Sequence, residues 1–207
     1  MTKPILTTTD LSSYGKTARL ILAEKNVDYD LHKVEFTGLG NEDYRSVHHP
    51  FAKVPAFRHG DVHLYETAAI AQYIDEAFDG PSLQPVDPVA RAQMRKWICV
   101  ADAYVYPAVI TGLVMERVVA PLNGIESNEE LIATSLPEIA RVLDVIEHEL
   151  ADRDYLAGSL SLADFFNATM LSFLPLAPEG AGLLEGRQAL GAWIARMTER
   201  KSYAQAA

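Results

Sequence analysis

Two neighbouring features most constrain the fold of this chain. A proline stands at the start of one short strand, and an acid and a hydroxyl follow at the start of a helix. The segment Lys53–Phe57 reads Lys-Val-Pro-Ala-Phe, and Tyr65-Glu66-Thr67 begins ten residues after the proline. Proline has no N–H for a sheet, so it occurs at the edge or first residue of a strand. The pair predicts a strand, a tight turn, a second strand and a helix, with free backbone groups close to the helix start.

The hydrophobic periodicity of the N-terminal half predicts the order β-α-β-α-β-β-α. Alternation of apolar and polar residues predicts strands, and repeats of three to four residues predict helices. A short turn at His59-Gly60-Asp61 separates the last two strands. The strands are expected at Ile5–Thr8, Tyr29–Phe36, Val54–Arg58 and Val62–Tyr65, and the helices at Thr17–Lys25, Glu42–His48 and Glu66–Phe78.

Three prolines and one glycine in residues 79–88 predict a linker, because helices do not cross such a stretch. We expect an α/β domain at residues 1–80, a linker at 81–87 and an all-helical domain at 88–207. Ser161 and Asp164 have the spacing of a capping box. Helices are expected at Val89–Val119 with a kink or break at Pro107 and Gly112, at Glu129–Leu150, at Leu162–Leu174 and at Gln188–Arg200.

The composition of the chain limits the kinds of protein that it can be. The chain has 207 residues, of which 49% are hydrophobic and 22% charged, so it can bury a core without metal or disulfides. The net charge of −10 argues against nucleic-acid binding, which needs clustered Lys and Arg. The single cysteine, Cys99, is expected in the core and excludes an internal disulfide. We find no long apolar run, expect no membrane span, and expect a cytoplasmic protein.

Pro55 has two interpretations. It can be an ordinary trans proline that opens an edge strand. Alternatively, the Val54–Pro55 bond is cis, which would turn the Val54 backbone N–H and C=O outward. An extended peptide could then pair with Val54 as an added strand would.

Glu66 and Thr67 also have two interpretations. An acid and a hydroxyl at a helix start can simply cap the helix. Free N–H groups and a hydroxyl at that place also form an anion site. A ligand carboxylate would bind there, and the Glu66 side chain would accept a hydrogen bond from a ligand ammonium.

Ser12 and Ser13 lie in the loop before the first helix. Either can be an N-cap, and the absence of a hydrolase motif argues against a nucleophilic serine. A serine hydroxyl can instead donate a hydrogen bond to a sulfur anion, with favourable help from the helix dipole. A bound thiol would then be largely a thiolate at neutral pH, which is its reactive form. The adjacent pair His48-His49 does not suggest a metal site, because neighbouring residues do not face one point.

The order of these motifs resembles the cytosolic glutathione transferases along nearly the whole chain. The resemblance rests on four N-terminal segments and on Ser161-Leu162-Ala163-Asp164, which looks like the start of that family's buried helix. It implies a thioredoxin-like first domain, an all-α second domain and glutathione as cosubstrate, without a metal. The N-terminal segments are Ser12–Arg19, Glu24–Tyr29, His49–Phe57 and Tyr65–Ile74.

The resemblance also implies roles for individual residues. Ser12 would donate to the thiolate, as in serine-type classes similar to phi, theta and zeta. A second serine and Tyr14 follow at once, where many relatives differ, so Ser13 and Tyr14 stay as alternative donors. The cysteinyl backbone of glutathione would pair with Val54 beside a cis Pro55, its γ-glutamyl end with Glu66 and Thr67, and its glycine end with Lys53, His49 or Asn41.

A transferase that adds glutathione to a hydrophobic electrophile is the favoured function. The resemblance implies a homodimer and places the electrophile near Tyr104, Thr111 and Met115, which could equally be core residues. The alternatives are a non-catalytic binding protein of the same fold and a glutathione-dependent peroxidase or isomerase. Tyr14 counts against the isomerase, because zeta-like isomerases usually carry a cysteine at that place.

Overall fold

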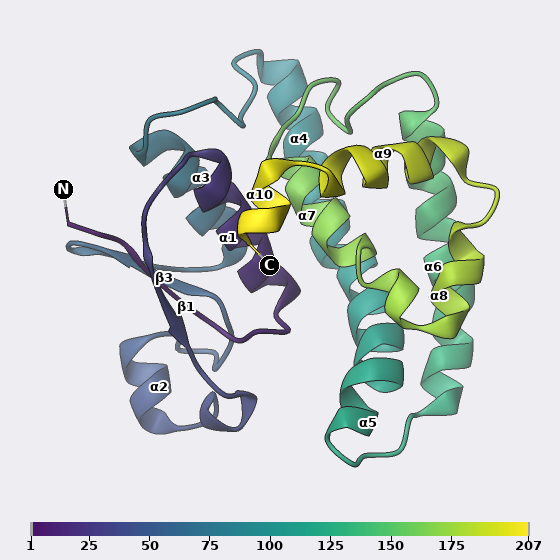
Figure 1. Ribbon diagram of the computed structural model, residues 1–207, viewed down its shortest axis with the longest axis horizontal. Helices are drawn as coiled ribbons and strands as arrows, with labels where there is room; N and C mark the ends of the chain where they lie inside the picture. The colour runs from purple at the N-terminus through teal and green to yellow at the C-terminus, as the bar shows by residue number, and fades with distance from the viewer. Residues whose placement is uncertain (1, 207) are drawn as a thin grey trace. The chain divides into compact units, whose positions relative to one another are not determined.

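The computed structural model describes residues 2–206, which divide into two compact units. The first comprises residues 2–84 together with 201–206, and the second comprises residues 85–200. Each unit is followed separately in Figure 1, where the chain runs from purple at the N-terminus to yellow at the C-terminus.

The first unit is an α/β domain built on a four-stranded sheet. Its strands are β1 (Ile5–Thr8), β2 (Asp30–Lys33), β3 (Ala56–His59) and β4 (Val62–Tyr65), and its helices are α1 (Ser13–Glu24), η1 (Phe36–Gly38), α2 (Glu42–Val47), α3 (Thr67–Ala77) and α10 (Lys201–Gln205). The strand order is β2-β1-β3-β4, with β1 parallel to β2 and antiparallel to β3. The expected order β-α-β-α-β-β-α is therefore present.

The two faces of the sheet differ in character. Leu6 and Phe57 are almost completely buried on one face, where the Phe57 ring lies 5.9 Å from the Tyr73 ring of α3. The other face carries His32 and Arg58, because successive strand residues point to opposite sides. The sequence alternation therefore determines which face packs against helices.

A buried ion pair joins the end of α1 to α3 and to the chain that follows it. Lys25 Nζ donates to Asp75 Oδ1 at 3.2 Å and to the Pro81 carbonyl at 3.1 Å. Asp75 Oδ1 also accepts from the Leu83 N–H at 2.8 Å. The proline-rich segment is thus anchored to the first unit through its backbone.

The last helix, α10, packs on α1, and Ser202 Oγ donates to Glu24 Oε1 at 2.6 Å. This placement differs from the expected division, in which residues 88–207 form one domain. No periodicity distinguishes a five-residue C-terminal helix that packs on a distant segment.

The second unit is all-helical. It contains α4 (Pro88–Val100), η2 (Ala101–Val119), α5 (Ala120–Leu122), α6 (Glu129–Leu150), α7 (Leu162–Leu171), η3 (Leu174–Leu176), α8 (Pro178–Leu184) and α9 (Gln188–Thr198). Every residue of α7 is buried, so this helix forms the centre of the unit. The capping box expected at its start is present, and α8 was not predicted.

Asp164 organises the start of α7. Its Oδ2 accepts from the Ser161 N–H at 2.9 Å, and its Oδ1 accepts from the Leu156 N–H and from Trp193 Nε1, both at 3.0 Å. Burial raises the pKa of Asp164, while these donors act in the opposite direction. One carboxylate therefore holds the loop at Leu156, the start of α7 and the indole of Trp193.

Of the kink or break expected at Pro107 and Gly112, the break does not occur. The helix continues from Pro88 to Leu122 for 35 residues, with π-type hydrogen bonding such as Ala120 N–H to the Met115 carbonyl. Proline has no N–H to donate within the helix, and the wider π turn accommodates the missing hydrogen bond without ending the helix.

The same helix corrects the expectation of no membrane-length segment. Its most apolar window has a mean hydropathy of 1.7, enough by length and composition to cross a membrane. Half of that window is buried inside the protein, as in core helices of ordinary domains. The property alone is weak support for a membrane location.

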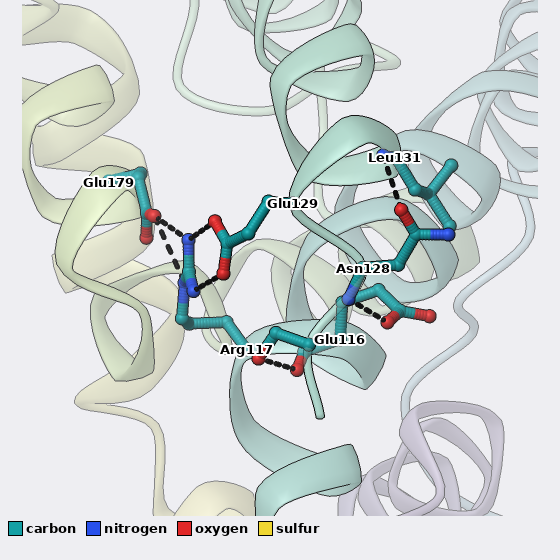
Figure 2. Close-up of polar contacts among 7 residues, drawn as sticks. Glu116, Arg117, Asn128, Glu129, Leu131 and Glu179 are labelled. Atoms are coloured by element: carbon teal, nitrogen blue, oxygen red, sulfur yellow. Dashed lines mark hydrogen bonds and ion pairs between the residues drawn. The ribbon is translucent and has the colours of Figure 1, made fainter. Parts of the chain in front are cut away.

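Arg117 links three helices of the second unit, as Figure 2 shows. From η2 it donates to both carboxylate oxygens of Glu129 on α6, at 2.7 and 2.9 Å, and to Glu179 on α8. These hydrogen bonds raise the pKa of Arg117 and lower the pKa of both carboxyl groups. The neighbouring Glu116 accepts from the Asn128 N–H at 2.9 Å, so both residues hold the start of α6.

Candidate active site

Ser12 is the N-cap of α1. Its Oγ accepts from the Gly15 N–H at 2.9 Å, and its backbone is extended, as N-cap geometry requires. A hydroxyl that accepts this bond keeps its own proton to donate elsewhere. The expected cap and the expected donor are therefore compatible in one side chain.

The two alternative donors lie on the first turn of α1. Ser13 is 4% exposed and is the first helical residue, and its hydroxyl has no hydrogen-bond partner in residues 2–206. Tyr14 is half-buried on the same turn. Ser12 differs from both alternatives because, of these three residues, only Ser12 accepts the capping hydrogen bond from the Gly15 N–H.

Gly15 allows the helix start to approach β1. A Cβ added at this glycine would lie 1.9 Å from Thr8 Oγ1 and 3.1 Å from the Ser12 Cβ. Only a residue without a side chain fits there, and the same residue supplies the N–H that holds Ser12. Sequence reasoning missed Gly15, although the spacing Ser-x-x-Gly of an N-cap and its donor was a usable signal.

Val54 lies in the loop before β3, and the Val54–Pro55 peptide bond is cis. The expected strand start at Val54 is wrong, because the ladder between β1 and β3 ends at the Thr7–Ala56 pair. No other residue in the described part of the chain hydrogen-bonds to the Val54 backbone. Tyr44 on α2 holds the preceding residue, since its hydroxyl donates to the Lys53 carbonyl at 2.7 Å.

Glu66 precedes α3 with a φ of 69°, which is uncommon for a residue other than glycine. Its exposed side chain makes no capping hydrogen bond, so the simple capping interpretation does not describe it. Thr67, the first residue of α3, is 7% exposed. An unfavourable backbone conformation held between a strand and a helix supports a hypothesis of function.

His49 is buried between two aromatic rings. Its ring lies 5.0 Å from that of Tyr65 and 6.1 Å from that of Phe51, whose N–H donates to His49 Nδ1 at 3.3 Å. Burial lowers the pKa of His49, Glu66 opposes this effect, and Lys53 adds to it. His49, Lys53 and Glu66 are therefore close enough to interact.

The remaining predicted site residues are more scattered. Asn41 precedes α2 on the surface without a capping bond from its side chain. Tyr104, Thr111 and Met115 are exposed on η2, so the alternative that they are core residues is wrong. Cys99 is also exposed, which corrects its expected core position, because its helix turns this residue outward.

Among residues 2–206, no group of three or more His, Cys, Asp and Glu side chains could hold a metal ion. His48 and His49 point to different surroundings. His48 stacks near Tyr44 at 5.2 Å, whereas His49 lies against Tyr65.

Comparison with known protein families is consistent with this geometry. The family model for the glutathione S-transferase N-terminal domain matches residues 6–82, and the model for the C-terminal domain matches residues 99–201. The chain is 32% identical to a glutathione S-transferase of Hyoscyamus muticus over 89% of this chain and 88% of the relative.

Solved structures of glutathione transferases are similar to this fold over nearly the whole chain. An apo structure of glutathione S-transferase III is 30% identical, with a TM-score of 0.88 over 99% of this chain and 95% of the other. A maize glutathione S-transferase I in complex with an atrazine glutathione conjugate is 26% identical, with a TM-score of 0.87 over 99% and 96%. The chain belongs to the glutathione transferase family and is an enzyme of that class.

Proposed function

We propose that this enzyme binds glutathione on its first unit and that Ser12 stabilises the thiolate, which then adds to a hydrophobic electrophile. The observation that carries the proposal is the Ser12 Oγ held at 2.9 Å by the Gly15 N–H at the start of a twelve-residue helix. In this arrangement the hydroxyl proton is free, and the positive end of the helix dipole favours an anion beside it.

The magnitude of one such hydrogen bond is sufficient. A hydrogen bond to a charged acceptor contributes roughly 1.5–3 kcal/mol. One pKa unit corresponds to about 1.36 kcal/mol. Ser12 alone can therefore lower a thiol pKa by about 1 to 2 units from its usual value near 8.5.

The rest of the tripeptide has matching groups on the same unit. The unpaired backbone of Val54 can pair with an extended peptide. The N–H groups at the start of α3 suit a carboxylate, and the Glu66 carboxylate suits an ammonium. Lys53 and His49, with Asn41 as a further candidate, supply donors for the glycine carboxylate.

A conjugation assay with an aryl halide tests this function. We expect Ser12→Ala to lower kcat by about 10²–10³-fold, as for loss of one preorganised donor to an anion. The matched control is Ser13→Ala, which removes the adjacent hydroxyl and should leave turnover near wild type. Titration of the bound thiol by its thiolate absorbance should show a higher pKa in Ser12→Ala only.

The opposite result identifies another donor. If Ser13→Ala or Tyr14→Phe raises the thiol pKa while Ser12→Ala does not, the assignment to Ser12 is wrong. If wild type binds glutathione and conjugates none of a panel of electrophiles, thiolate activation is not its role.

We also propose that Tyr104, Thr111 and Met115 contact the electrophile. All three are exposed on η2, and the large exposed side chains of Tyr104 and Met115 suit an apolar substrate. Met115→Ala should raise KM for an apolar electrophile and leave KM for glutathione unchanged. A change in the glutathione KM alone would contradict this role.

A homodimer is proposed as the working assembly in the cytoplasm. Phe51 is 66% exposed and lies 6.1 Å from the ring of Tyr65, which is 39% exposed. Such an exposed aromatic pair suits a self-complementary interface. Sedimentation should show a dimer for wild type and a monomer for Phe51→Asp, and unchanged mass in the variant would place the interface elsewhere.

A further inference from the structure

A hollow on the polar face of the sheet is lined by none of the residues proposed to contact glutathione. Its volume is about 300 Å³, and Val47 and His48 at the end of α2 line it together with residues of the sheet. The basic side chains around it are His32 from β2, Arg58 from β3, His63 from β4 and His48. Four different segments thus direct basic groups to one place.

Strand register explains why these side chains converge. Arg58 pairs with Ile5 on one side and with His63 on the other, so these residues share one face. Thr7 lies two residues after Ile5 and pairs with His32, which puts His32 on that face too. Strand alternation therefore brings His32, Arg58 and His63 to one face, and the end of α2 adds His48.

Contacts within the hollow hold the rings in place. The His32 and His48 rings are 5.4 Å apart in an edge-on arrangement. His63 Nε2 lies 3.1 Å from the His48 carbonyl, and His32 Nδ1 lies 3.5 Å from Thr7 Oγ1. These contacts orient the three rings and leave Arg58 without a hydrogen-bonded acceptor in the described residues.

Among the described residues that line the hollow there is no carboxylate. Asp30 is on the same face of β2, but Lys3 Nζ binds it at 2.8 Å. From α2, Tyr44 also faces His48, and burial raises the pKa of Tyr44 to about 12, so it remains neutral. The hollow therefore gathers four basic groups in a chain whose net charge is −10.

We propose that this hollow binds the phosphoryl group of inorganic phosphate or of a small phosphate monoester. Arg58 supplies a fixed fork of N–H donors that matches two phosphate oxygens. The imidazoles approach from other segments, which suits a tetrahedral anion with oxygens in several directions better than a planar carboxylate. The positive charge of Arg58 among the histidines would repel a metal cation in the same place.

Binding is coupled to proton uptake. Burial lowers the pKa of His48, and His32, His63 and Arg58 lower it further. A bound dianion offsets these positive charges and favours the imidazolium form of His48. Affinity therefore increases as the pH falls from 8 to 6.

Calorimetry with inorganic phosphate, without glutathione, tests the site at both pH values. Sulfate serves as a second probe because it stays a dianion, whereas inorganic phosphate changes its own charge between the two pH values. We expect sulfate to bind about tenfold more tightly at pH 6 than at pH 8, and Arg58→Gln to weaken both anions about tenfold or more. The matched control Arg95→Gln makes the same charge change on exposed α4 and should leave affinity unchanged.

A spectroscopic readout keeps the proposal testable if Arg58→Gln folds poorly. The ring protons of His32, His48 and His63 should shift with phosphate, and those of His59 should not. His63→Gln should reduce the affinity in parallel. Equal weakening by Arg95→Gln, shifts spread over all histidines, no saturable binding, or zinc binding in place of anion binding would each overturn the site.

Discussion

Lys25 and Asp75 form an ion pair whose side chains are only 3% and 4% exposed. The pair joins the C-terminal end of α1 to α3, fifty residues later in the chain. Asp75 also receives the Leu83 N–H, so the two residues fix the place where the α/β unit ends.

Removing one member of this pair should be strongly destabilising. Lys25→Met leaves Asp75 buried without its cation, and breaking a buried pair costs about 3–5 kcal/mol of unfolding free energy. Urea denaturation measures the change. Lys33→Met breaks the exposed pair with Asp10 and should cost less than about 1 kcal/mol. Equal effects of the two variants would show that burial does not decide the cost.

Gly15→Ala tests the close approach of α1 to β1. The added Cβ would overlap Thr8 Oγ1, so we expect a loss of about 1–3 kcal/mol in stability and weaker glutathione binding. Gly191→Ala in α9 meets nothing within 4 Å and should be neutral or stabilise by about 0.5–1 kcal/mol. Unchanged stability and activity of Gly15→Ala would refute the steric constraint.

Asp164→Ala should destabilise the helical unit by at least about 3 kcal/mol. The change leaves buried N–H donors of Leu156, Ser161 and Trp193 without an acceptor, at about 1–3 kcal/mol each. Asp164→Asn keeps one acceptor oxygen, so its stability should lie between that of wild type and that of Asp164→Ala. Tryptophan fluorescence during denaturation monitors the transition, and a wild-type midpoint in the alanine variant would contradict this role.

The lowered pKa of His49 predicts a pH dependence of stability. The folded ring stays neutral, whereas the unfolded chain binds a proton below about pH 6.5, so the unfolding free energy falls as the pH falls through that value. The loss continues down to the folded pKa. His49→Gln retains an acceptor without titrating, and its stability curve should be flatter between pH 7.5 and 5.5. Parallel curves would assign the pH dependence to other groups.

The Arg117 contacts in Figure 2 should stabilise the beginning of α6 and α8 locally. Arg117→Gln removes the guanidinium that joins Glu129 to Glu179. We expect faster amide hydrogen exchange at Leu131 and in α8, with little change in α7. High salt should reduce the difference between variant and wild type, because these carboxylates are partly exposed.

Much of the site follows from local sequence. The start of α3 at Thr67 was predictable from capping chemistry and periodicity. Ser12 was recognisable as a possible N-cap, but periodicity placed the first helix at Thr17, four residues after its observed start at Ser13. The capping box at Ser161 and Asp164 was predictable for the same reason. The expected strand at Val54 began too early, since pairing with β1 rather than composition determines where a ladder ends.

Nonlocal contacts could not be predicted from the sequence. The approach of Gly15 to Thr8, the turn of Cys99 to the surface and the packing of α10 on α1 depend on segments that are far apart or on helix rotation. The continuity of the helix through Pro107 also required its tertiary surroundings.

The sequence by itself determined the family, the β-α-β-α-β-β-α order of the first unit and the caps at Ser12 and Ser161, because short-range periodicity and capping depend on neighbours along the chain. Only the tertiary structure decided which of these residues meet. It placed His49 beside Glu66, and His48 beside His32, since strand register and burial act between residues that are remote in sequence.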